Sequence, residues 1–292
     1  MTADLIELPN KSRKMNNMKI KVGLDIGGST TKIVGMQDGK IIASEIVKAA
    51  DPVTSAFGAV GRLINDHSLS VNDIEQINIT GVGAGFTQAP IFGIKTVVVE
   101  EFLATGLGGL FLSGLDHAVV VSMGTGTAYF EATKDNVRHI IGSGVGGGTV
   151  VGLGLAVTGT SDAIKLSDMA TEGDILKCDL TIGDITKNGV TGLPMNVTAS
   201  NFGKAADDLT KEDKMAGVFN LVYQSIGTVA VMASRQCGIK DIVFTGQLTD
   251  LKECQKYLIP FEELYGVNMI VPDNAVFATA IGSCLAEGQE EK

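Results

Sequence analysis

The chain of 292 residues has few side chains that bind metals tightly or carry redox chemistry, with four cysteines, three histidines and no tryptophan. The cysteines are scattered, without a CxxC pair or a Cys/His cluster, at Cys178, Cys237, Cys254 and Cys284. A structural zinc site or an iron–sulfur centre needs several such ligands at close spacing. The composition therefore argues against both centres and predicts reduced thiols, as in a cytoplasmic protein.

Positive charge is also scarce, because the chain has 23 Lys and Arg residues against 33 Asp and Glu residues, which gives a net charge of −10. Binding of nucleic acid usually needs a basic face, so we expect no nucleic-acid partner. No apolar stretch reaches the roughly 18 residues of a membrane span without polar interruption. Residues 1–17 are polar and lack the apolar core of a signal peptide,. We therefore expect no membrane association and a cytoplasmic location, and the 45% of hydrophobic residues predicts a globular core,.

Glycine is abundant by contrast, and it gathers in three turns that also carry hydroxyl groups. Each turn follows an apolar run, and they span residues 25–32 (DIGGSTTK), 124–127 (GTGT) and 146–149 (GGGT). Glycine lets the backbone approach a ligand closely and present bare N–H groups to an anion. Two such turns on separate strands, the first with an Asp and a Lys at its ends, are typical of a site for a nucleotide polyphosphate and its metal.

The pattern strand, glycine turn, strand, hairpin, strand occurs twice, starting at about residue 20 and again at about residue 117. This is a duplication of structural pattern without obvious sequence repetition. It predicts an α/β fold of two related lobes, residues 19–115 and 116–286, with the nucleotide cleft between their glycine turns and with terminal tails at 1–18 and 287–292. Two unrelated hairpins are the alternative.

Apolar periodicity predicts the remaining elements. The expected helices are residues 52–67, 102–112, 151–157, 162–172, 211–237, 249–258 and 275–285. The expected strands outside the two repeated units are residues 74–80, 96–99, 241–245 and 268–271. The apolar face of helix 211–237 fits either the core or a dimer contact.

Individual residues of the turns have distinct expected roles. Asp25 ends a strand at the expected cleft, where a carboxylate can hold Mg²⁺ through water, although it could instead cap the turn,. Lys32 could reach the phosphates as a point charge or lie in solvent. The expected contacts to the phosphates of ATP come from the turn residues Gly27, Gly28, Ser29, Thr30, Gly124, Thr125, Gly126, Thr127, Gly146, Gly147 and Gly148. For the last three glycines, close packing between helix and strand is the alternative.

An acidic pair follows the strand at 96–99 and precedes a helix. A carboxylate there can act as general base toward a primary hydroxyl. Glu101 is the candidate and Glu100 the runner-up. The alternative is an acidic helix N-terminus that interacts with the helix dipole.

In their order along the chain, the motifs of this sequence resemble the type II (eukaryotic-like) pantothenate kinases, of the actin-like ATPase and sugar kinase superfamily. The resemblance covers about residues 19–286 and rests on the three turns, Glu100-Glu101-Phe102, Ile182-Gly183-Asp184-Ile185, Ala199-Ser200-Asn201-Phe202-Gly203, Val243-Phe244-Thr245-Gly246-Gln247 and Ile281-Gly282. It implies two actin-like (ribonuclease H-like) lobes and ATP-dependent phosphorylation of the 4′-hydroxyl of pantothenate, the first step of coenzyme A biosynthesis. It also implies a homodimer, and it suggests an acyl-CoA as a feedback ligand.

The resemblance assigns further roles. The second acid of the pair is the family's base, which here is Glu101; Gly246 and Gln247 match the adenosine site. Thr125 takes the place of a serine that also lies near pantothenate.

One departure concerns the acceptor. The family has an arginine before the third turn that contacts the pantothenate carboxylate, and an ungapped alignment on that turn puts His139 there, beside Arg138. A neutral histidine is a weaker carboxylate anchor than a bidentate arginine. Both residues are therefore candidates for the substrate site.

Three alternatives remain open at this point. The chain could be a kinase of the same superfamily for another small hydroxyl compound. It could be an ATP-driven switch such as a dehydratase activator, although its cysteines do not lie in matching loops. It could also be a homologue without catalytic activity.

Overall fold

The computed structural model describes residues 19–48, 51–86, 89–204 and 206–286, so the two expected tails lie outside the described residues. The first sheet has the strand order β3-β2-β1-β4-β5. Its strands are β1 (Ile20–Ile26), β2 (Thr30–Gln37), β3 (Lys40–Lys48), β4 (Ile74–Thr80) and β5 (Thr96–Val98). The first three strands are antiparallel neighbours, and β4 and β5 run parallel to β1.

The second sheet repeats this arrangement, with the order β12-β11-β6-β7-β8. Its strands are β6 (His117–Met123), β7 (Thr127–Thr133), β8 (Val137–Ser143), β11 (Asp241–Thr245) and β12 (Asn268–Ile270). Again three antiparallel strands come first, and two parallel strands extend the sheet on the other side of β6. The predicted duplication is therefore confirmed strand by strand.

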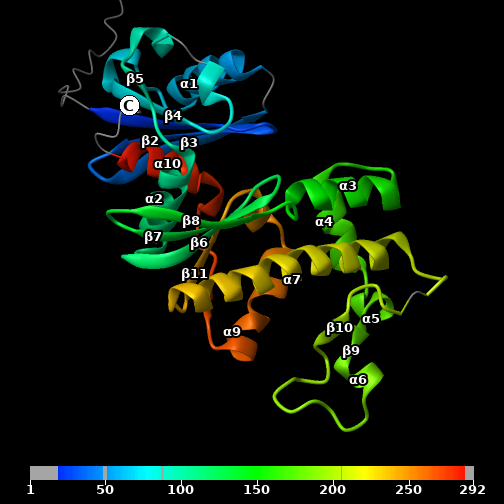
Figure 1. The fold of residues 1–292 in the computed structure, drawn as a ribbon. Coiled ribbons are helices and arrows are strands. Elements are labelled where there is room, and N and C mark those ends of the chain that lie inside the picture. The colour runs from blue at the N-terminus through cyan, green and yellow to red at the C-terminus, as the bar shows by residue number, and fades with distance from the viewer. Residues whose placement is uncertain (1–18, 49–50, 87–88, 205, 287–292) are drawn as a thin grey trace, which may run out of the picture.

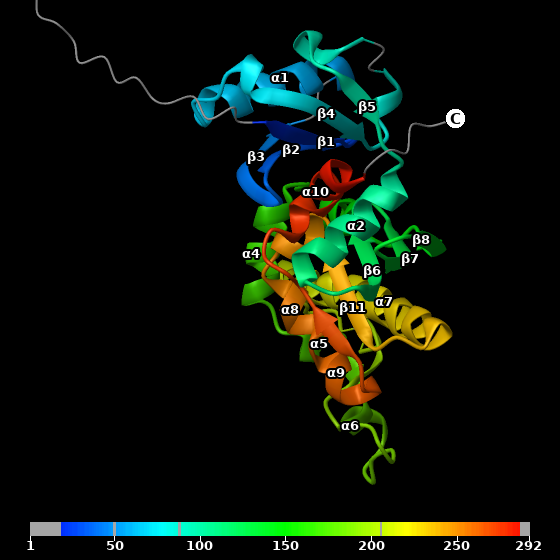
Figure 2. The same cartoon turned by 90° about the vertical axis from the view of Figure 1, so that its left-hand side faces the viewer.

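Two helices lie side by side between the sheets, and each packs on the sheet that the other half of the chain forms (Figure 1, Figure 2). Helix α2 (Glu101–Ser113) follows the first sheet in sequence, but its Leu110 packs in one apolar cluster with Ala118 and Val120 of β6. Helix α10 (Ala278–Leu285) follows the second sheet, but its Ile281 packs against Val34 and Met36 of β2. The two halves of the chain thus exchange one helix each.

The outer faces of the sheets are covered by helices from their own half. Helix α1 (Pro52–Asp66) packs on the first sheet, starting at Asp51, whose carboxylate accepts the N–H groups of Val53 and Thr54. On the second sheet lies α7 (Lys211–Cys237), and α3 (Gly147–Thr158) and α4 (Ala163–Glu172) pack against α7. Where one helix over 249–258 is predicted, the structure has a 3₁₀ turn at Gln247–Asp250 and the short helix α8 (Glu253–Leu258); a further short helix, α9 (Pro260–Tyr265), follows.

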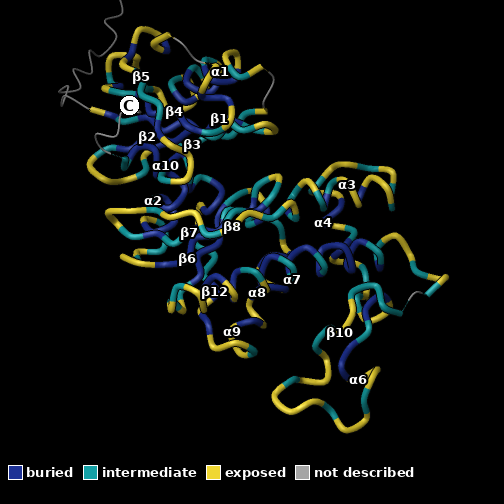
Figure 3. The backbone as a smooth tube through the Cα atoms, in the orientation of Figure 1, coloured by how far each residue is buried: buried dark blue, intermediate teal, exposed yellow. Residues whose placement is uncertain are grey.

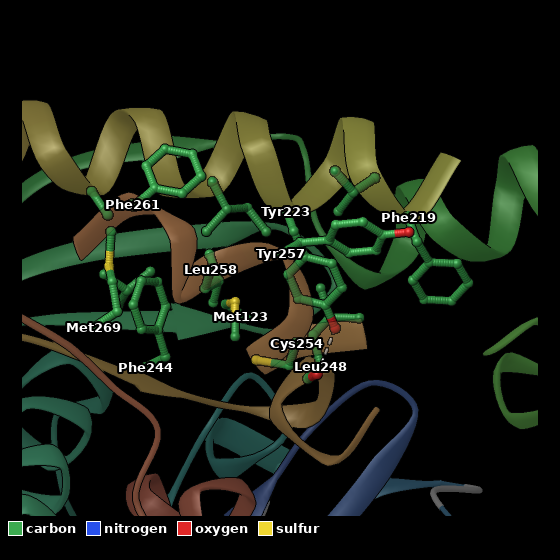
Figure 4. Packing of buried hydrophobic residues seen from close by; sticks show 14 of the residues in the cluster. Met123, Phe219, Tyr223, Phe244, Leu248, Cys254, Tyr257, Leu258, Phe261 and Met269 are labelled. Atoms are coloured by element: carbon green, nitrogen blue, oxygen red, sulfur yellow. Dashed lines mark hydrogen bonds between the residues drawn. The ribbon is translucent and has the colours of Figure 1, made fainter. Parts of the chain in front are cut away.

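Helix α7 is the core helix of the second lobe. Its Phe219 and Tyr223 pack among aromatic and apolar side chains from α8, α9 and the sheet (Figure 4). By length and composition alone α7 would pass for a membrane span, but 67% of its most apolar stretch is buried inside the protein. Met215, Val222 and Ile226 are fully buried as well, so this apolar face belongs to the core.

Residues 174–204 form an excursion from the second lobe that the sequence patterns do not predict. It contains α5 (Ile175–Cys178), β9 (Leu180–Thr181), α6 (Ile182–Ile185) and β10 (Thr198–Ser200). Its chain around α6 is mostly exposed (Figure 3). Its base is held by the buried carboxylate of Asp179, which accepts the N–H of Phe202 at 2.8 Å and the side-chain amide of Asn220 at 2.6 Å.

Candidate active site

Asp25 and Lys32 form a mostly buried ion pair at the end of the first hairpin. They are register partners on β1 and β2, and Lys32 Nζ lies 3.4 Å from Asp25 Oδ2. The Lys32 side chain is only 13% exposed, so it does not lie in solvent. Burial raises the pKa of Asp25, while the ammonium of Lys32 acts in the opposite direction. The pair is held at the strand ends, next to the first glycine turn.

The first turn presents part of the expected set of donors. The N–H of Gly27 closes the turn by donating to Thr30 O at 3.1 Å, so this N–H does not face a ligand as expected. Gly28 and Ser29 are exposed, and within the described chain no protein acceptor takes their N–H groups. Thr30 is half-buried at the start of β2. Two free N–H groups and a hydroxyl at the tip thus remain for an anion.

The second and third turns pack against each other. The N–H groups of Gly147 and Gly148 donate to Gly124 O and Thr125 O, both at 2.8 Å. The N–H of Gly146 donates to the hydroxyl of Thr149 at 3.1 Å. The expectation that Gly146, Gly147 and Gly148 offer their N–H groups to a phosphate is therefore wrong for this structure, because protein oxygens take all three.

The tip of the second turn remains open. Thr125 is exposed and Gly126 half-buried, and no protein acceptor takes either N–H within the described residues. The Thr127 hydroxyl, expected at the phosphates, is buried and donates to Val145 O at 2.8 Å instead. Thr127 therefore stabilises the start of α3, and the tip residues Thr125 and Gly126 carry the donors.

The two acids at the start of α2 have different environments. Glu100 is the N-cap of α2, and its carboxylate accepts the N–H groups of Phe102 at 3.0 Å and Leu103 at 2.6 Å. Glu101 makes no such bond and stays open to solvent on one side. Desolvation by the surrounding protein raises the pKa of Glu101. The charges of Asp25 and Glu100 raise this pKa further, and Lys32 lowers it.

His139 and Arg138 are adjacent in β8, so their side chains point to opposite faces of the second sheet, and the bulge in the β7–β8 pairing beside them sets His139 opposite Phe130. The ring of His139 stacks on Phe102, with centroids 5.1 Å apart and planes at 15°, directly beside Glu101. Arg138 instead binds the carboxylate of Glu131, with Nε at 3.1 Å from Oε2, and contacts Cys237 of α7. The structure therefore does not bring Arg138 to the site, because its neighbours on the α7 face hold it there.

The 3₁₀ turn at Gln247–Asp250 brings the second lobe to this region. Gly246 has φ of +92°, a left-handed conformation that favours glycine, and its N–H donates to Ala275 O at 3.1 Å. Gln247 is exposed at the start of the turn. Desolvation raises the pKa of Asp250, and the charge of Lys32 on the first lobe lowers it. Asp250 therefore lies within electrostatic range of Lys32 across the junction of the lobes, a placement that sequence reasoning missed.

No group of three or more His, Cys, Asp or Glu side chains that could hold a metal occurs in the described part of the chain. A pocket of about 360 Å³ lies at the far end of α2, remote from Glu101. It is lined by Leu107, Leu110, Phe111, Gly114, Leu115, Asp116, Lys134 and Leu285.

Comparison with known proteins decides the family. The model of the Fumble family matches residues 117–261. The chain is 30% identical over 275 residues to the type II pantothenate kinase of Staphylococcus aureus (strain MRSA252), covering 90% of this chain and 98% of that protein. The enzyme of strain USA300 is 29% identical over 279 residues, covering 92% and 100%. The chain belongs to the type II pantothenate kinase family.

Solved structures with low sequence identity show the fold of this family member. Component A of the (R)-2-hydroxyglutaryl-CoA dehydratase of Acidaminococcus fermentans has a TM-score of 0.66 at 17% identity, covering 91% of this chain and 96% of that chain. A ROK family glucokinase from Streptomyces griseus, solved with glucose and AMPPNP, has a TM-score of 0.58 at 12% identity, covering 91% and 98%. The predicted fold of two actin-like lobes is confirmed.

Proposed function

We propose that this chain transfers the γ-phosphoryl group of ATP to the 4′-hydroxyl of pantothenate, the first step of coenzyme A biosynthesis. Membership of the type II pantothenate kinase family supports this reaction. The observation that carries the proposal is the placement of Glu101. Its carboxylate accepts no N–H group of the helix and has a raised pKa. It lies within electrostatic range of both Asp25 and Lys32 at the junction of the lobes. A base in this position can accept the proton of an attacking hydroxyl.

The glycine turns bind the nucleotide in this proposal. The N–H groups of Gly28, Ser29, Thr125 and Gly126 face the phosphates, and Lys32 adds a point charge,. Gly246 and Gln247 contact the adenosine. These contacts hold the transferring group still and stabilise its charge, which is most of what phosphoryl transfer requires from a protein.

Mg²⁺ fits the residues beside the first turn. Asp25 provides a carboxylate at a strand end, and no cage of three protein ligands accompanies it among the described residues. Mg²⁺ keeps several waters and is usually bound by one or two carboxylates together with the phosphates of its substrate. When bound, the metal neutralises charge on the phosphates. Asp25 holds it through water in this proposal.

His139 replaces the arginine that would bind the pantothenate carboxylate. It lies on the Glu101 side of the second sheet, stacked on Phe102, whereas Arg138 is held by Glu131 on the other face. Thr125 lies near the same acceptor. Because an ionic hydrogen bond contributes about 1.5–3 kcal/mol, an imidazole at position 139 predicts weaker binding of pantothenate than a bidentate arginine would give.

A panel of hydroxyl compounds tests the function, with purified protein, MgATP and ADP release as the readout. We expect pantothenate to be the preferred acceptor, and His139→Arg to lower its KM by about tenfold or more. Arg138→Ala is the matched control and should change KM little. A severe Arg138→Ala defect without gain from His139→Arg would contradict the placement, and turnover of another alcohol alone would contradict pantothenate as the substrate.

The assembly and the cell biology are part of the same proposal. The protein acts in the cytoplasm as a homodimer, with an acyl-CoA as a feedback ligand. α3, α4 and the excursion carry exposed apolar side chains, at Leu153, Leu155, Ile164, Leu176, Ile185, Val190 and Met195. Light scattering coupled to gel filtration tests the dimer.

The alternative function as an ATP-driven switch is disfavoured, because three of the four cysteines are buried at separate places.

A further inference from the structure

A buried hydroxyl without a partner lies at the end of β4, beside the Asp25 carboxylate. Thr80 is 0% exposed, and its Oγ1 has no hydrogen-bond partner. In the β1–β4 register Thr80 is the partner of Asp25, so both side chains leave the sheet on the same face,. Leaving a buried donor unpaired is costly, and such groups in native structures have a reason.

The duplicated lobe provides an internal reference for this position. In the second sheet Thr245 of β11 is the partner of Ser122 of β6, just as Thr80 is the partner of Asp25. A glycine with left-handed backbone follows each threonine, with φ of +86° at Gly81 and +92° at Gly246. The Thr245 hydroxyl donates to Val121 O at 3.3 Å. Thr80 does not make the equivalent hydrogen bond to a backbone carbonyl oxygen. Its hydroxyl is therefore available as a donor, at a position where its register partner carries a carboxylate.

The backbone around Thr80 brings the Asp25 carboxylate close. A Cβ on Gly81 would lie 2.6 Å from Asp25 Oδ1, so the carboxylate rests against the residue that follows Thr80. Among the described residues, the hydrogen bond to this carboxylate comes from Lys32, at 3.4 Å. In the proposed function Lys32 turns to the phosphates, which would leave Asp25 in need of a new donor.

We propose that Thr80 is a positioning residue whose hydroxyl donates to the Asp25 carboxylate and orients it toward the water shell of the magnesium ion of MgATP. The inference rests on the proposed function and deepens it. Partners of metal-binding groups act in this way, and their loss typically lowers metal affinity about 10- to 100-fold. Thr80 touches neither nucleotide nor metal in this role.

The test compares Thr80→Val with Thr31→Val. Thr31 has the other buried threonine hydroxyl without a partner, on the opposite face of the same sheet, toward α1. Binding of a non-hydrolysable ATP analogue is measured by calorimetry with Mg²⁺ and with EDTA, together with the melting temperature. Electron paramagnetic resonance of Mn²⁺ in the analogue complex reports metal affinity directly.

We expect Thr80→Val to weaken the Mg²⁺-dependent binding by about tenfold or more, with binding in EDTA unchanged. Its melting temperature should stay the same or rise, because a methyl replaces an unpaired buried hydroxyl. Thr80→Ser should restore the wild-type affinity, and Thr31→Val should leave it unchanged. Each of these readouts uses binding and stability, without turnover.

Three results would overturn the inference. They are unchanged Mg²⁺-dependent binding in Thr80→Val, equal loss of binding with and without Mg²⁺ in Thr80→Val, and the same Mg²⁺-dependent loss in Thr31→Val. Should wild type bind the analogue with Mg²⁺ but phosphorylate no pantothenate, the proposed function fails while the variants still decide the role of Thr80. Should wild type show no Mg²⁺-dependent binding, both proposals are wrong.

Discussion

Glu100 and Glu101 are adjacent in the sequence but have different hydrogen-bond partners. The carboxylate of Glu100 is occupied by two N–H groups of the first turn of α2. Glu101 has no such bond and is repelled by the charge of Asp25. Glu100 thus caps α2, which leaves Glu101 as the acid available for chemistry.

Glu101→Gln should lower kcat by roughly 10²-fold or more, the usual effect of removing a positioned base. The affinity for the ATP analogue should stay near that of wild type, because the glycine turns hold the nucleotide independently. Glu100→Ala is the control and should lower the melting temperature while retaining most turnover. Steady-state kinetics and thermal unfolding measure both effects. Full activity of Glu101→Gln with loss in Glu100→Ala would move the base to position 100.

The same residue predicts a pH dependence. A base must be ionised, and burial with nearby negative charge raises the pKa of Glu101 above the usual value for glutamate. The acidic limb of the kcat profile should therefore lie at higher pH than an ordinary glutamate would give, with activity lost as pH falls through the raised pKa. This limb should disappear in Glu101→Gln. An unchanged limb in that variant would assign it to another group, Asp25 first.

At the scale of elements, two carboxylates join helix α7 to the excursion: Asp179, which binds Asn220, and Asp213. Asp213 lies in the first turn of α7 and accepts the N–H groups of Asp174 at 2.9 Å and Thr210 at 3.2 Å. These bonds, with the bond from Asp174 first, lower the pKa of Asp213 to about 2. A carboxyl group whose pKa is lower in the folded than in the unfolded protein stabilises the fold at pH values above its unfolded pKa. This stability is lost as the pH falls toward 2.

Asp213→Ala should lower the free energy of unfolding by about 1–3 kcal/mol, since two backbone N–H groups lose a charged acceptor. The loss should be largest near neutral pH and shrink in acid. Glu212→Ala is the matched control, because it removes the same charge from the same turn, and the structure gives the Glu212 side chain no hydrogen bond. Urea denaturation at several pH values measures both. Equal losses in the two variants would mean that charge, not bonding, carries the effect.

Elements with strong periodicity could be predicted from the sequence, several with correct bounds. Strands β1, β4 and β11 and helix α7 begin and end where the apolar patterns predict. The excursion could not be predicted, since α5, α6, β9 and β10 have two to four residues each. Such short elements have little signal of their own and depend on tertiary bonds, here those to Asp179 and Asp213,.

The site shows the same division between local and tertiary information. Asp25, Lys32 and Glu101 could be placed from strand ends and spacing. The choice between Arg138 and His139 depends on a bulge between Tyr129 and Phe130 that shifts the register, and no local pattern predicts it,. The role of Thr80 could have been suggested by one signal, the Thr-Gly pair that ends β4 and recurs at the end of β11.

For the whole molecule, the exchange of α2 and α10 sets how the lobes move. The helices cross so closely that a Cβ on Gly282 would overlap the carbonyl oxygen of Ala104, and one on Gly108 would overlap that of Ala278. The hydroxyl groups of Thr105 and Thr279 lie 3.0 Å apart at the same crossing. Each helix packs on the sheet of the other half, so a change of lobe angle must pass through this contact.

We predict that the lobes close on nucleotide around this crossing, as is common for paired domains with a ligand between them. The radius of gyration from X-ray scattering should fall when wild type is saturated with the ATP analogue and Mg²⁺. Gly282→Ala should force α2 and α10 apart, lower the free energy of unfolding by about 1–3 kcal/mol and reduce the change in the radius of gyration on ligand binding.

Gly58→Ala in α1 is the matched control. Gly58 is an exposed position of the helix and a Cβ there meets no atom within 4 Å, so alanine should raise the stability by about 0.5–1 kcal/mol and leave closure intact. Identical radii with and without nucleotide in wild type would contradict closure. Normal closure in a folded Gly282→Ala protein would instead place the hinge elsewhere than the crossing of the two helices.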